Sequence, residues 1–132
     1  MATLLDECLD ALGDDKEILS YSETSKIFKS FISTFPITKW GVIDWSGVDK
    51  KYIVSKAEEI KHIFKMHKPE SDIKVYILWN DNSLPSIAVD MDKAMKVIDD
   101  VTAVSFDTWL YNDKEKYVIE FHHEGLVTLG FA

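Results

Sequence analysis

The spacing of apolar residues changes near residue 74, and this change constrains the fold more than any other feature of the chain. Before that point, apolar side chains recur mostly every three or four residues, as on one face of a helix. After it, most apolar residues stand in short runs separated by turn residues, as in strands. The predicted order of elements is α-α-β-α-β-β-α-β-β-β. This order indicates an α+β fold, in which helices pack on one largely antiparallel sheet of about five to six strands. The length of 132 residues fits a single domain over 1–132.

Four segments are predicted to be helices because apolar residues recur on one face. They are Leu4–Leu12, Glu23–Ser33, Lys56–His67 and Met91–Val101. Thr3 and Asp90 are suited to cap the first and last of them, and Gly13 to end the first. Ser55 and Glu58 have the spacing of a capping box at the start of the third.

Six segments are predicted to be strands from their β-branched and aromatic residues and the turn residues between them. They are Thr38–Asp44, Lys74–Trp79, Leu84–Val89, Ser105–Tyr111, Lys116–His123 and Leu126–Phe131. Pro85 places its strand at an edge of the sheet or at a strand start, because proline has no N–H to donate. The turn at Glu124 and Gly125 is short enough for a hairpin.

The charge of the chain indicates what it binds. It has 23 acidic residues against 15 basic ones, a formal net charge of −8, and every basic residue is a lysine. Without the two-pronged guanidinium of arginine, the chain is poorly equipped to hold nucleic acid or a phosphorylated substrate. Residues 71–132 hold 11 of the acids and only 5 lysines. An acidic, aromatic-rich chain of this kind is better suited to a basic protein partner.

The N-terminal residues and the single cysteine favour a cytoplasmic protein. The first twelve residues hold three acids and no lysine, unlike a secretory signal peptide. No apolar run approaches the ~20 residues of a membrane span. Cys8 has no cysteine to pair with, which fits a reducing compartment. Its spacing among leucines predicts a buried structural thiol and not a nucleophile.

We predict no catalytic residues, no cofactor and no metal. His122 and His123 are adjacent in a predicted strand, so their side chains are expected on opposite faces, where they cannot share an ion. The chain has no G-x-S-x-G elbow and no grouped glycines for a phosphate loop. Paired catalytic carboxylates stay open, because acids are numerous.

The hairpin formed by the strands Ser105–Tyr111 and Lys116–His123 holds the candidate binding residues. Its expected pairs are Tyr111 with Lys116, Trp109 with Val118 and Asp107 with Glu120. One face then carries Asp107, Trp109, Tyr111, Glu120 and His122. The opposite face carries an apolar set expected in the core, namely Phe106, Leu110, Tyr117, Ile119 and Phe121.

Two carboxylates directly opposite each other destabilise a strand pair, so such a face is a candidate to receive cationic side chains from a partner. Trp109 and Tyr111 are of the residue types enriched at binding hot spots. The alternatives are a solvated face and a face covered by the N-terminal helices.

The C-terminal part of the chain resembles a known family. The runs KVYILWND, LPSIAVDM, VSFDTWLYND and KYVIEFHHEGLVTLGF, within Lys74–Phe131, resemble immunity proteins of bacterial contact-dependent growth inhibition and related polymorphic toxin systems. The resemblance implies a small, acidic, cytosolic protein that binds and neutralises the toxic C-terminal domain of a cognate delivered protein, often a basic nuclease. The leading hypothesis is a non-enzymatic inhibitor that occludes the toxin's active site or substrate surface. The hairpin residues, which come from the strand pattern and not from the family, are its toxin-binding candidates.

Two other functions stay open from the sequence. One is an adaptor that binds a peptide or protein at a sheet edge, for which Leu84–Val89 is the expected edge strand. The other is a small hydrolase that uses unrecognised carboxylates or His122. A concave pocket with convergent titratable groups would favour the hydrolase.

Overall fold

The computed structural model describes residues 3–67, 74–81 and 83–132 of the chain. The described helices are α1 (Leu4–Leu12), α2 (Tyr21–Thr34), α3 (Ala57–His67), α4 (Met91–Lys96) and α5 (Ile98–Thr102), with a short 3-10 helix at Trp45–Gly47. The described strands are β1 (Glu17–Ile18), β2 (Lys50–Val54), β3 (Lys74–Trp79), β4 (Ile87–Asp90), β5 (Thr108–Asn112), β6 (Tyr117–Phe121) and β7 (Val127–Phe131). None of the described helices is long and apolar enough to cross a membrane.

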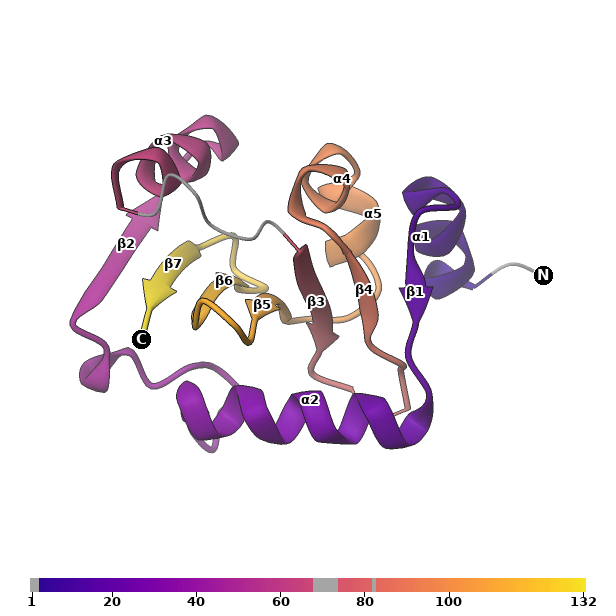
Figure 1. The fold of residues 1–132 in the computed structure, drawn as a ribbon, viewed down its shortest axis with the longest axis horizontal. Coiled ribbons are helices and arrows are strands. Elements are labelled where there is room, and N and C mark those ends of the chain that lie inside the picture. Colours follow the sequence, from indigo (N-terminus) through magenta and orange to yellow (C-terminus); the bar gives the residue numbers. More distant parts are fainter. Residues whose placement is uncertain (1–2, 68–73, 82) are drawn as a thin grey trace.

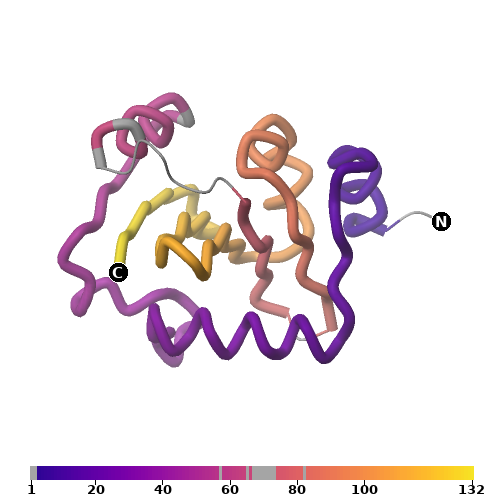
Figure 2. Tube along the Cα trace, in the orientation of Figure 1, coloured from indigo at the N-terminus to yellow at the C-terminus, as the bar shows by residue number. Residues whose placement is uncertain are grey.

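The strands form one antiparallel sheet of seven strands in the order β1-β4-β3-β5-β6-β7-β2. The α+β prediction is confirmed, with slightly more strands than expected. Helix α2 runs across one face of the sheet, and α1, α3, α4 and α5 lie on the other (Figure 1). The tube in Figure 2 follows the same path and shows the C-terminal strand β7 beside β2, which comes from the first half of the chain.

Both faces of the sheet are buried, each under its own apolar cluster. The larger cluster joins α1, α3, α4 and α5 to the sheet and includes Phe64, Leu110 and Ile119. The smaller cluster lies under α2 and includes Phe31 and Trp109. Because helices cover both faces of the sheet, β5 is buried along its whole length and β3 is buried or partly buried at every residue but Lys74.

The observed helix starts and their capping residues can be compared with the predicted ones. The bounds of Leu4–Leu12 are confirmed, and Thr3 forms a capping box there. Ser20 forms another, so α2 begins two residues before the predicted Glu23. At α3, the Ser55 backbone N–H donates to Glu59 at 3.0 Å, so the predicted partner Glu58 is wrong by one residue.

The last predicted helix, Met91–Val101, is interrupted. Val97 has φ −121° and ψ 32°, which separates α4 from α5. Asp90 precedes α4 but makes no side-chain capping hydrogen bond.

The prediction of a strand over Thr38–Asp44 is wrong. This segment folds back on itself with a single bridge between Ile37 and Ile43. Gly41 has a φ of 80°, a left-handed conformation that glycine adopts without strain, and the Thr38 N–H donates to the Val42 carbonyl across the turn at 2.8 Å. A reversal at this glycine leaves no straight run to pair with a sheet.

The expectation that Leu84–Val89 forms a sheet edge is also wrong. Strand β4 lies between β3 and the two-residue strand β1, which the sequence analysis did not predict. Pro85 lies just before β4, as a proline near a strand start does. The edges of the described sheet are β1 and β2, and β2 was not predicted either.

Candidate functional site

The β5–β6 hairpin differs from its predicted register by two residues. Trp109 lies opposite Glu120, and Tyr111 lies opposite Val118. Asp107 and Glu120 are therefore not paired, and the expected repulsion between them is absent. A shift of two residues keeps each side chain on its predicted face, because side chains alternate with a period of two.

The face that carries Trp109 and Tyr111 is not open to a partner. Both side chains are fully buried under α2, and Glu120 is buried beside them. The Phe31 ring lies 5.1 Å from the Trp109 ring and 5.3 Å from the Tyr111 ring, and the Tyr111 hydroxyl is 2.9 Å from the Ser30 hydroxyl. The expectation of an exposed face is wrong, and the alternative of a face covered by an N-terminal helix is right. Toxin contact by Asp107, Trp109, Tyr111, Glu120 and His122 stays a prediction.

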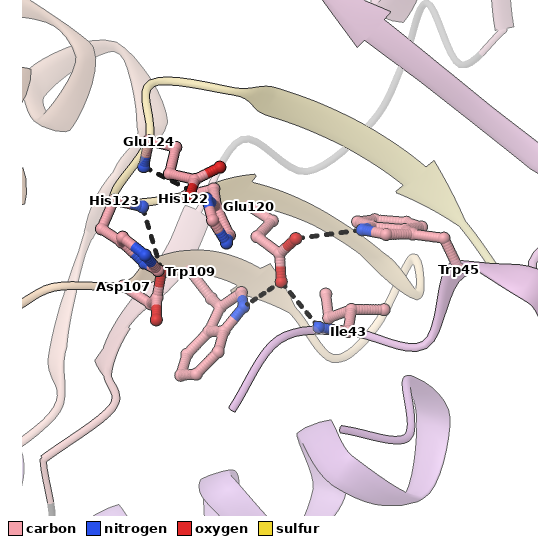
Figure 3. A network of polar contacts seen from close by, with 8 residues as sticks. All are labelled: Ile43, Trp45, Asp107, Trp109, Glu120, His122, His123 and Glu124. Atoms are coloured by element: carbon pink, nitrogen blue, oxygen red, sulfur yellow. Dashed lines mark hydrogen bonds and ion pairs between the residues drawn. The ribbon is translucent and has the colours of Figure 1, made fainter. Parts of the chain in front are cut away.

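Glu120 accepts three hydrogen bonds from N–H groups (Figure 3). The backbone N–H of Ile43 donates to Oε2 at 2.8 Å, and the Trp109 indole donates to the same oxygen at 2.9 Å. The Trp45 indole donates to Oε1 at 3.0 Å. A buried carboxylate is costly unless its oxygens are hydrogen-bonded, and these donors supply that compensation. Glu120 therefore fastens the irregular segment around Trp45 to the sheet, a role the sequence did not reveal.

Asp107, His122 and His123 gather at the end of the same hairpin (Figure 3). Oδ1 of the buried Asp107 lies 3.1 Å from the backbone nitrogen of His123 and 3.1 Å from its Nδ1. The two imidazole rings stack with their centroids 4.1 Å apart. His122 Nδ1 accepts the backbone N–H of Glu124 at 3.1 Å.

The prediction that His122 and His123 point to opposite faces of a strand is wrong, because β6 ends at Phe121 and both residues lie in the turn that follows. One potential ligand atom from each of Asp107, His122 and His123 falls within 4.8 Å of the others. These residue types could hold a transition-metal ion. The Nδ1 atoms of both histidines already take part in hydrogen bonds, His123 Nδ1 with Asp107 and His122 Nδ1 with the Glu124 backbone N–H. The prediction of no metal stays a prediction.

The described part of the chain contains a pocket of about 870 Å³ beside this cluster. Its apolar lining comes from helices and strands on the face opposite α2, namely Val54, Ile60, Met95, Ile98, Phe121 and Val127. Phe106, expected in the core, instead lines this pocket and is 83% exposed, because it precedes β5 and not all of the predicted strand is formed. The other members of the predicted apolar face are buried or partly buried.

Sequence reasoning missed this pocket. One sequence signal points to it: the chain has no lysine in 97–113 or in 117–132, the two stretches that supply most of its lining.

Cys8 is a buried thiol in α1, as predicted. Burial, with a smaller contribution from the negative charge of Asp100, raises the pKa of the Cys8 thiol to about 11. A thiol that stays protonated at neutral pH is a poor nucleophile, so its environment fits a structural role.

Comparison with known proteins extends these observations. The family described as "CdiI immunity protein EcoliA0-like" matches residues 2–130. A curated protein of Bacillus subtilis (strain 168), "Uncharacterized protein YqzI", is 50% identical over 34 residues, which are 26% of this chain. The chain spans 65% of the length of that relative.

Proposed function

We propose that this chain, which belongs to the EcoliA0-like family of CdiI immunity proteins, neutralises a basic nuclease domain by binding it and occluding its active site or substrate surface. A toxin-neutralising role follows from the family, and proteins of this kind are generally not enzymes. The observation that carries the proposal is the family match, which covers residues 2–130 and so includes the smaller apolar cluster and all of the larger one except Phe131.

The charge of the chain supports the basic character of the partner. A nuclease domain needs cationic side chains to hold nucleic-acid phosphates. A chain with a net charge of −8 and no arginine cannot compete for those phosphates, but its carboxylates can compete with them for the cations of the toxin. We propose that this competition takes place in the cytoplasm, where the substrate of a delivered nuclease lies.

Co-production with the candidate toxin tests the proposal. Since an immunity gene is expected directly after the gene for its large secreted toxin protein, the probe is the C-terminal domain of the protein encoded by that upstream gene. We expect that domain alone to stop growth and degrade nucleic acid, and this chain to restore growth and form a 1:1 complex with it. The empty vector is the control. Growth arrest that persists despite well-folded immunity protein would contradict the neutralising role. A toxin without nuclease activity would contradict the proposal that the partner is a nuclease.

A further inference from the structure

The 870 Å³ pocket is open to solvent and is lined more by apolar than by polar surface. Its lining combines β2, α3, α4 and α5 with the turn that joins β6 and β7. These elements come from both halves of the chain, so the hollow forms only in the folded protein. Soluble domains seldom leave a large concave surface with an apolar lining unless it takes a ligand or a partner.

Phe106 is an exposed aromatic residue at this pocket. Its side chain is 83% exposed, and its ring lies 5.9 Å from the His123 ring in an edge-to-face arrangement. Burying a phenylalanine side chain lowers the free energy, because its apolar surface leaves water. The fold leaves this free energy unused, whereas a partner that covers Phe106 would gain it.

The charges around the pocket specify the partner. Asp81 and Asp99 line it and are exposed, while Lys56 is the only lysine among the described lining residues. Asp81 accepts hydrogen bonds from the Ser83 hydroxyl and backbone N–H, which hold the pKa of its carboxyl below the ordinary value. Asp81 is therefore a fixed negative charge at neutral pH.

We infer that this pocket is the docking surface for the toxin and that it receives a segment bearing lysine or arginine, with Phe106 as the apolar anchor. The inference rests on the proposed function, since it names the surface by which the toxin is bound. The aliphatic stem of a lysine or arginine can lie on the apolar lining, while its charged end reaches the exposed carboxylates of the pocket. A neutral or acidic segment would leave Asp81 and Asp99 unpaired at the interface.

Affinity measurements with two variants and two matched controls test the inference. Phe106→Ala removes the anchor, and Trp40→Ala is its control, because Trp40 is 76% exposed and lies outside the pocket. Asp99→Lys reverses a charge of the pocket, and Asp49→Lys makes the same change at an exposed position away from it. The probe is the upstream-encoded toxin domain, titrated by calorimetry.

We expect each pocket variant to raise the dissociation constant about tenfold or more and each control to change it less than about twofold. Thermal unfolding checks that all four variants fold. Wild-type affinity in both pocket variants would contradict the proposal that this pocket binds the toxin. A loss of affinity confined to Phe106→Ala would contradict the proposal that the bound segment is basic. A wild-type chain that does not bind the toxin at all would instead contradict the proposed function.

Discussion

At the scale of single residues, Glu120 shows how a carboxylate can be a structural centre. Its three N–H donors come from β5 and from the irregular segment between α2 and β2. The sequence predicts the face of the hairpin on which Glu120 lies, but not the groups that surround it. Its donors Ile43 and Trp45 lie about 75 residues away along the chain. No local pattern predicts such a long-range contact.

We expect Glu120→Gln to destabilise the fold by about 1–3 kcal/mol. A glutamine side chain has one acceptor oxygen, so at least one buried N–H donor would face its NH₂ group without a partner. Urea unfolding measures the loss, and Glu124→Gln at an exposed position is the control. An unchanged or raised stability would mean that the three N–H donors do not need the carboxylate of Glu120.

The raised pKa of the Cys8 thiol predicts a pH dependence of stability. A group with a raised pKa in the folded state stabilises the fold below its unfolded pKa, and this contribution disappears as the pH rises through the folded value. For Cys8 the window runs from about 9 to about 11. We expect the stability advantage of wild type over Cys8→Ala to shrink between pH 7.5 and 10.5 in urea titrations. A constant advantage across that range would contradict an unusually high thiol pKa.

Asp107 and His123 are hydrogen-bonded to each other, and His122 Nδ1 already accepts the Glu124 backbone N–H, so we expect Zn²⁺ to leave the melting temperature of wild type unchanged. Thermal unfolding with added Zn²⁺ and with EDTA measures this. A stabilisation by Zn²⁺ that disappears in His123→Ala would show that the three groups do bind metal.

At the scale of elements, the sequence predicts what local signals determine. Helix α1 and strand β3 were predicted at their observed bounds, because caps and continuous apolar runs mark them. The edge strands β1 and β2 escaped prediction. Strand β1 has only two residues, and β2 is mostly exposed, so its pairing with β7 decides its conformation more than its own residues do.

Close packing between elements predicts the effect of an alanine at Gly130. A Cβ at this position of β7 would lie 2.4 Å from the Trp45 ring, whereas at Gly47 it would meet nothing within 4 Å. Gly130→Ala should therefore displace Trp45 and break its hydrogen bond to Glu120, at a cost of about 1–3 kcal/mol in unfolding free energy. Gly47→Ala is the matched control in the same denaturant titration. Equal stability of the two variants would mean that Trp45 moves aside without loss.

At the scale of the whole molecule, the two covered faces leave little of the sheet for recognition. The helices bury the aromatic face on which sequence reasoning relied, and most of the described acidic residues of the C-terminal half lie in loops and turns and in α4 and α5. Composition therefore predicts a basic partner without indicating which residues contact it. Electrostatic attraction acts over several ångströms and does not require particular residues to touch the partner. A contact surface depends on which side chains the fold leaves uncovered.

This charge predicts how association with the toxin depends on salt. A net charge of −8 attracts a basic domain before contact, and ions screen that attraction, since the Debye length falls from about 10 Å at 0.1 M to about 3 Å at 1 M salt. Stopped-flow association rates should therefore fall about tenfold or more between about 0.05 and 0.5 M NaCl, while dissociation rates change much less.

Two variants of equal net charge provide the control. Asp99→Lys, which removes negative charge at the proposed pocket, should give an association rate that depends less steeply on salt than that of Asp49→Lys. Identical slopes would assign the steering to total charge and not to the pocket, and a rate indifferent to salt would remove electrostatic steering from the mechanism altogether.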